Sequence, residues 1–87
     1  MELYFKPGAV RVIKKLNQQE RTIVKRVLQD LKETPEAGGF LKGSLVGLRK
    51  WKFRIASVPY RIVYQIKKER LEIIAVGRRK DFYELLK

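Results

Sequence analysis

The chain has 87 residues, and its 21 lysines and arginines against 9 acidic residues give it a formal net charge of +12. This length excludes a multidomain protein. With 45% hydrophobic and 34% charged residues, the composition is that of a folded domain and not of a disordered chain. So large an excess of positive charge predicts a polyanionic partner.

Cysteine and histidine are both absent. Their absence excludes disulfides, cysteine or histidine catalysis and the usual zinc ligand sets. Any catalysis must therefore use Lys, Arg, Tyr, Asp or Glu, and we expect no cofactor and no metal site. No apolar run approaches the roughly 20 residues that span a bilayer, and no signal-peptide segment begins the chain. We expect a cytoplasmic protein without a membrane partner.

The first half of the chain has the patterns of a short strand and two helices. Residues 2–5 are rich in strand formers and lead into Pro7, which suits the first turn of a helix. Apolar residues then recur at helical spacing, namely Ala9, Val10, Ile13 and Leu16.

A second helix is predicted after a tight connection, so that the two helices form an antiparallel hairpin. Asn17 followed by Glu20 resembles a capping box. An apolar stripe follows, formed by Ile23, Val24, Val27, Leu28 and Leu31. Thr34 and Pro35 end this helix, because the residue before a proline disfavours helical geometry.

The second half of the chain alternates between apolar and cationic residues, which is the pattern of strands. A loop over residues 35–47, with four glycines, precedes it. Residues 50–55 place two sets of side chains on opposite faces, Trp51, Phe53 and Ile55 on one and Lys50, Lys52 and Arg54 on the other. After a break at residues 57–59, a second strand alternates Tyr60, Ile62, Tyr64 and Ile66 with Arg61, Val63 and Gln65.

These two strands are expected to form a hairpin that gathers cations. If its apolar side chains face the helices, Arg61 shares a surface with the cations of residues 50–54, because side chains alternate with a period of two. Residues 71–76 are apolar at nearly every position, which predicts a central or well covered strand that ends at Gly77. Asp81 can then begin a short C-terminal helix.

The expected fold is α+β with two layers: an N-terminal helix hairpin on an antiparallel-rich sheet of about four strands, and a short C-terminal helix. Its open sheet face carries either solvated charge or a polyanion site, since guanidinium groups bind phosphate oxygens well. Four aromatic residues could instead stack on bases, but their alternation assigns them to the core: Trp51, Phe53, Tyr60 and Tyr64.

Several motifs together resemble the RelE/ParE superfamily of type II toxins. They are Leu41-Lys42-Gly43, Trp51-Lys52-Phe53-Arg54, Tyr60-Arg61-Ile62-Val63-Tyr64 and Val76-Gly77-Arg78-Arg79. The resemblance covers essentially the whole chain and implies one RelE-like toxin domain over residues 1–87. It also implies an endoribonuclease that cleaves messenger RNA in the ribosomal A site, with the RNA 2′-hydroxyl as nucleophile and without a metal.

The resemblance places the RelE-like catalytic positions on Lys52, Arg54, Arg61, Arg79 and Tyr83. RelE has a lysine where this chain has Arg54, which can bind phosphate but cannot readily give up a proton. Lys52 is therefore the candidate for proton transfer. Tyr83 would contact the scissile nucleotide, or else it covers the core.

Further basic residues are candidates for contacts with RNA or the ribosome, namely Arg49, Lys50, Arg78, Lys80, Lys14 and Lys25. Those on the helices are either ordinary solvated charges or contacts to ribosomal RNA, which would make association steeply dependent on salt.

Two other functions compete with the ribonuclease. The ParE branch of the superfamily inhibits DNA gyrase and lacks the ribonuclease cations, and a nucleic-acid-binding module would bind without cutting. The presence of Lys52, Arg54, Arg61 and Arg79 favours the ribonuclease. The resemblance also implies a RelB-like antitoxin with an acidic or amphipathic segment that covers the cationic face, and a toxin that is monomeric within a hetero-oligomer.

Overall fold

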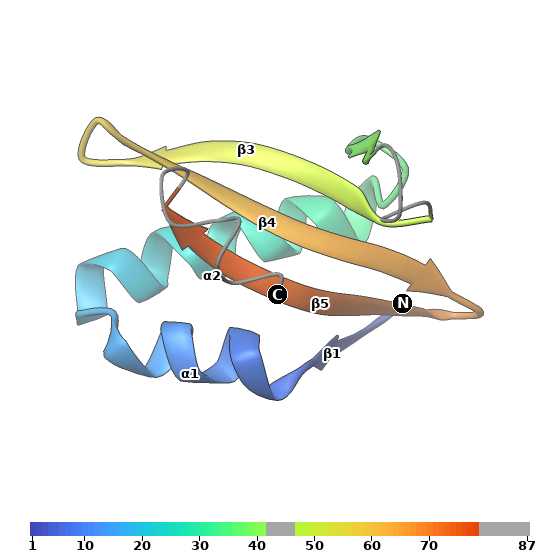
Figure 1. Cartoon of the computed structure of the whole chain (residues 1–87), viewed down its shortest axis with the longest axis horizontal. Helices are drawn as coiled ribbons and strands as arrows, with labels where there is room; N and C mark the ends of the chain where they lie inside the picture. Colours follow the sequence, from blue (N-terminus) through green and yellow to red (C-terminus); the bar gives the residue numbers. More distant parts are fainter. Residues whose placement is uncertain (42–46, 79–87) are drawn as a thin grey trace.

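A computed structural model describes residues 1–41 and 47–78 of the chain. Its fold has two layers, one of helices and one of strands. Its elements are β1 (Glu2–Phe5), α1 (Pro7–Lys15), α2 (Gln18–Glu33), β2 (Gly39–Phe40), β3 (Arg49–Ile55), β4 (Val58–Lys67) and β5 (Arg70–Arg78). Both helices lie on the same face of the sheet, as Figure 1 shows. The α+β architecture expected from the sequence is confirmed, while the predicted C-terminal helix lies outside the described residues.

The helix hairpin is held together at its turn by side-chain hydrogen bonds. The backbone N–H of Asn17 donates to Glu20 and that of Glu20 donates to Asn17, both at 2.8 Å, which confirms the capping box. Arg21 then donates to the carbonyl oxygens of Ile13 (3.2 Å) and Lys14 (2.7 Å), which satisfies groups that the end of α1 leaves without helical partners. These contacts fix the tight connection between α1 and α2.

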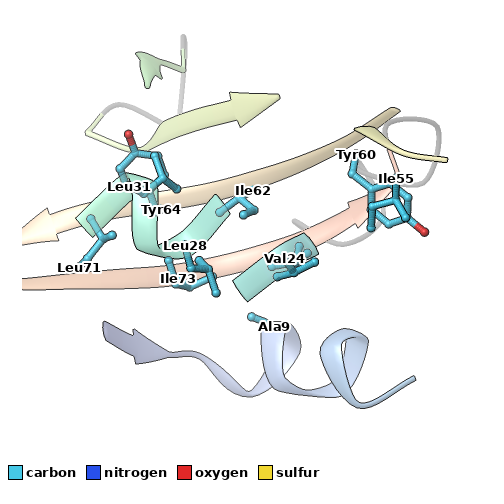
Figure 2. Packing of buried hydrophobic residues seen from close by; sticks show 11 residues of the cluster. Ala9, Val24, Leu28, Leu31, Ile55, Tyr60, Ile62, Tyr64, Leu71 and Ile73 are labelled. Carbon is cyan, nitrogen blue, oxygen red and sulfur yellow. The ribbon is translucent and has the colours of Figure 1, made fainter. Parts of the chain in front are cut away.

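The apolar faces of both helices are buried against the sheet. The stripe predicted on α2 is confirmed, with Val24, Leu28 and Leu31 fully buried (Figure 2). On α1 the prediction was partly wrong, because the core takes Ala9, Val12, Ile13 and Leu16 but not Val10. The observed set has the i, i+3, i+4, i+7 spacing of one helical face, and Val10 lies beside that face.

In the described part of the chain the sheet is mixed, with five strands in the order β1-β5-β4-β3-β2. β1 pairs in parallel with β5, and all other pairs are antiparallel. The expected number of about four strands was one too low, because the two-residue β2 lies in the segment predicted as a loop and is too short to show alternation. The prediction of a well covered third strand is confirmed, since β5 lies between β1 and β4.

Two strand boundaries differ from those predicted. β4 already begins at Val58, because the turn after β3 consists of Ala56 and Ser57 alone, with φ angles of 49° and 73°. Positive φ at both central residues is typical of the tightest hairpin turns, which match the twist of the strands. β5 continues through Gly77 to Arg78, since Gly77 still pairs with Arg61.

Tyr64 joins the core to the loop that follows α2. Its ring is fully buried among the side chains that Figure 2 shows, and its hydroxyl donates to the carbonyl oxygen of Pro35 and accepts from the N–H of Gly38, both at 2.9 Å. Burial raises the pKa of the Tyr64 hydroxyl, so it stays protonated and can donate. A Cβ at Gly38 would lie 2.7 Å from the carbonyl oxygen of Lys50, so this close approach requires glycine.

Replacing Tyr64 with phenylalanine should lower the free energy of unfolding by about 1–3 kcal/mol, because the change leaves buried backbone groups of Pro35 and Gly38 without their partner. Urea denaturation followed by circular dichroism measures this. Tyr60→Phe is the matched control, since Tyr60 is buried on the same strand and its hydroxyl makes no hydrogen bond within the described residues. Equal losses in the two variants would contradict the anchoring role of Tyr64.

Candidate nucleic-acid interface

The pairing of β3 with β4 brings the predicted cations together on one surface. Lys52 pairs directly with Arg61, while Lys50 pairs with Val63 and Arg54 with Pro59. The alternate residues of both strands, Trp51 and Ile62 among them, belong to the helix-covered core. Cβ atoms of directly paired residues lie about 4.5–5.5 Å apart. The expectation that Lys50, Lys52, Arg54 and Arg61 share the open face is therefore confirmed.

Among the described residues, these cations have no acidic partners. None of the ion pairs found within residues 1–41 and 47–78 involves them. Lys52 and Arg54 are exposed, and Arg54 donates one hydrogen bond to the carbonyl oxygen of Ser57 at 3.2 Å. The Nε of Arg61 is buried and has no hydrogen-bond partner in the described part of the chain. A buried donor without a partner is costly, and an anion beside Lys52 and Arg61 would satisfy it.

Gly77 contributes no side chain beside Arg61. Arg61 lies in the sheet between Lys52 on β3 and Gly77 on β5. Since glycine has no side chain, nothing from this β5 position extends over the open face next to the guanidinium group. Glycine inside a strand often marks a point of close approach by another molecule.

A second apolar cluster lies on the open face, and the sequence analysis missed it. We call it the open-face cluster, and it consists of the buried Val63 and Ala75 with the half-buried Leu41, Leu48 and Ile74. The N–H of Leu41 donates to the carbonyl oxygen of Leu48 at 2.9 Å, which holds the two leucines together. The signal in the sequence was the apolar run from Ile73 to Val76 in β5, because a strand with only one covered face would alternate.

A buried carboxylate lies further along the same face, and the sequence analysis did not single it out. Glu72 is 2% exposed and contacts Arg70 at 3.2 Å and Lys6 at 4.0 Å, and it accepts a hydrogen bond from Gln65 at 3.1 Å. The hydrogen bond from Gln65, with nearby lysines and Arg70, lowers the pKa of Glu72 below its usual value. Arg70 also lies over the ring of Tyr4, 4.8 Å from its centre.

Other residues predicted to contact RNA lie elsewhere. Arg49 pairs with Tyr64 and so belongs to the helix-covered side, where it donates to the carbonyl oxygens of Glu36 (3.0 Å) and Gly38 (2.9 Å) and lies 3.9 Å from the centre of the Phe40 ring. These contacts indicate that Arg49 stabilises the loop after α2.

Arg78 also lies on the helix-covered side, because it pairs with the core residue Tyr60. Lys14 lies on α1 and Lys25 on α2, and both are exposed. The two helices cover one face of the sheet (Figure 1), and Lys52 alternates with the core residues Trp51 and Phe53 that face them. The other predicted site residues, Arg79, Lys80 and Tyr83, lie outside the described residues.

The described residues show neither a metal site nor a membrane span. In residues 1–41 and 47–78 no three acidic side chains group so that they could hold a metal ion. Neither helix in this part of the chain is long and apolar enough to cross a bilayer.

Comparison with known protein families identifies the family of this chain. A family model described as the ParE-like toxin of type II bacterial toxin-antitoxin systems matches residues 3–87. The chain belongs to this family. No curated protein matches this toxin in sequence.

Solved structures of RelE toxins are similar to this toxin over nearly its whole length. A double arginine-to-alanine mutant of Escherichia coli RelE in the free state is 31% identical, with 98% of this chain and 88% of that chain covered and a TM-score of 0.75. The toxin of the intact E. coli RelBE toxin-antitoxin complex is 27% identical (87% and 93% covered, TM-score 0.69). A chain of the RelBE2 complex of Mycobacterium tuberculosis is also 27% identical (90% and 96% covered, TM-score 0.68). The expected RelE-like fold is confirmed.

The lowered pKa of Glu72 predicts a dependence of stability on pH. A carboxyl group whose pKa is lower in the folded than in the unfolded protein stabilises the fold at any pH above its pKa in the unfolded chain, here 4.5. This stabilisation is lost as the pH falls through the lower pKa of the folded state. Thermal melts should therefore show Glu72→Gln less stable than the wild type at pH 6, with the difference vanishing towards pH 2. Glu69→Gln, in the exposed turn before β5, is the control. A difference that persists unchanged at pH 2 would contradict this role of Glu72.

Proposed function

We propose that this toxin is an endoribonuclease of the RelE type, which acts in the cytoplasm and cleaves messenger RNA in the ribosomal A site. The observation that carries the proposal is the pair of Lys52 and Arg61 on the open face, where the buried Nε of Arg61 has no partner among the described residues. The similarity to RelE structures at 27% to 31% identity supports it.

The arrangement suits transfer of a phosphate within the RNA chain. The 2′-oxygen forms a bond to the adjacent phosphorus while the bond to the 5′-oxygen breaks, and the proton lost by the 2′-hydroxyl is balanced by one gained at the leaving oxygen. Arg61 and Arg54 can hold the phosphate oxygens as negative charge builds up on them. Lys52 is the candidate for moving the proton, because arginine cannot readily release one.

This mechanism needs no metal, and Arg79 and Tyr83 remain further candidates for the same site. Lys50 adds positive charge on the same strand as Lys52, where it can attract the RNA backbone.

An antitoxin partner is part of the same proposal. Structures of RelE toxins exist in complex with the antitoxin RelB. A net charge of +12 on this chain favours a partner with an acidic segment, which would lie over the cations of the open face and keep RNA away. We propose that the toxin is monomeric and joins such an antitoxin in a hetero-oligomer.

Primer extension on messenger RNA in programmed ribosomes tests the activity. Cleavage in the A-site codon should appear with wild-type toxin and only with ribosomes. Lys52→Ala and Arg61→Ala should each reduce it by about 100-fold or more, because each removes a group that acts in the transition state. Lys67→Ala is the matched control, since it removes the same charge from an exposed position at the far end of β4 and should cleave normally.

The name of the matching family favours a second candidate, inhibition of DNA gyrase by a ParE-like toxin. A supercoiling assay separates the two functions. The toxin is a gyrase inhibitor and not a ribonuclease if it cleaves no messenger RNA on ribosomes and if its Lys52→Ala and Arg61→Ala variants still inhibit gyrase. Binding of RNA without cleavage or gyrase inhibition would indicate a plain nucleic-acid-binding module.

A further inference from the structure

We propose that the turn between β3 and β4, formed by Ala56 and Ser57, is a positioning device that holds the guanidinium group of Arg54 ready for a phosphate of the RNA. This inference rests on the proposed function and deepens it, because it assigns a role in the reaction to two residues outside the set of predicted cations. The link is a hydrogen bond of 3.2 Å, which Nη1 of Arg54 donates to the carbonyl oxygen of Ser57.

The backbone of this turn is strained. Ala56 and Ser57 both have positive φ, at 49° and 73°, although neither is a glycine. Hairpin turns of this kind strongly prefer asparagine, aspartate or glycine, because a Cβ atom makes the left-handed conformation unfavourable for most other residues. Strained backbone clusters at functional sites, where the surrounding structure holds it in place. The turn is therefore a candidate for a role beyond connecting two strands.

The strands on either side of the turn fix its position. Ile55, the last residue of β3, is 5% exposed and pairs with Val58, the first residue of β4. Phe53 and Tyr60 pair two residues further from the turn, and the centres of their rings are 5.7 Å apart. Ile55, Phe53 and Tyr60 all belong to the helix-covered core. The turn cannot move without disturbing this packing, so its carbonyl oxygens have defined places.

The chemistry of arginine suits this arrangement. A guanidinium group carries several N–H donors, so a group that gives one of them to Ser57 can still hold a phosphate with the others. Arg54 itself is exposed, on the same face as Lys52. A long side chain that is already held loses less conformational freedom when RNA binds. Such placement matters for the reaction, because a shift of about 1 Å can cost about 100-fold in rate.

A longer turn tests the proposal, because it moves the carbonyl oxygen away from Arg54. Insertion of one glycine between Ala56 and Ser57 should lower the rate constant for cleavage on programmed ribosomes, at saturating toxin, by about 10-fold. The toxin concentration that gives the half-maximal rate should stay nearly unchanged, since Arg54 is one of many basic residues that can contact RNA. The double variant Ala56→Asn/Ser57→Gly keeps the length of the turn and supplies the residue types it prefers, so it should cleave like the wild type.

Two further variants show whether the turn acts through Arg54. In the Arg54→Ala background the same insertion should cause no further loss of rate, whereas damage to the fold would add to the loss. The matched control is a glycine inserted between Lys68 and Glu69, in the other two-residue hairpin turn at the far end of β4 (Figure 1). This control should cleave normally, and thermal melts check that every variant is folded.

NMR relaxation measures the hold on Arg54 without any substitution. In the RNA-free toxin the Nε–H group of Arg54 should be less mobile on the picosecond to nanosecond time scale than that of Arg11. Arg11 is the matched reference, because it is exposed on α1 and its side chain makes no hydrogen bond within the described residues. Equal mobility of the two groups would overturn the proposal.

The outcomes separate this inference from the proposed function. The positioning role is wrong if the insertion between Ala56 and Ser57 cleaves at the wild-type rate, or if it lowers the rate by the same factor in the Arg54→Ala background. It is also wrong if Arg54→Ala itself cleaves normally. In each of these cases, Lys52-dependent cleavage on ribosomes would still uphold the ribonuclease. A folded wild-type toxin that cleaves no messenger RNA would overturn both.

Discussion

The register between β3 and β4 is the constraint on which the candidate site depends. Because successive side chains point to opposite faces, the pairing of Lys52 with Arg61 also places Trp51 and Ile62 against the helices. A shift by one residue would bury the cations under the helices and expose the aromatic rings. Burial of the apolar face therefore holds the cations on the open face, and the stability of the fold and the geometry of the site have the same origin.

The sequence predicted those parts of the structure whose signals are local. The start of α2 follows from the capping pair Asn17 and Glu20, and its buried face follows from the apolar stripe after them. Both signals lie within the helix itself, so no distant residue is needed to recognise them. The grouping of Lys52 with Arg61 was also predictable, because strict alternation on both strands and a short turn leave few possible registers. In each case the local pattern agrees with the final tertiary contacts.

The remaining features depend on contacts between distant segments. Arg49 has the same chemistry as the cations of the open face, but the loop after α2 brings the carbonyl oxygens of Glu36 and Gly38 to it. The irregularity between Val63 and Tyr64 shifts the pairing of β5, so that Ile74 and Ala75 both join the open-face cluster. Periodicity in the sequence cannot show such a shift, because it assumes that alternation continues.

The parallel pairing of β1 with β5 also bears on how the toxin is made. β1, the first strand of the described chain, pairs only with β5, the last one, from Glu2 with Arg70 to Phe5 with Ile73. During synthesis the early segments must therefore wait until β5 has left the ribosome, and contacts so far apart in sequence form slowly. A growing chain has no complete sheet and hence no ordered row of Lys52, Arg61 and Gly77. The row on which the candidate site depends therefore becomes ordered late in synthesis, long after the segment that supplies β1 has been made.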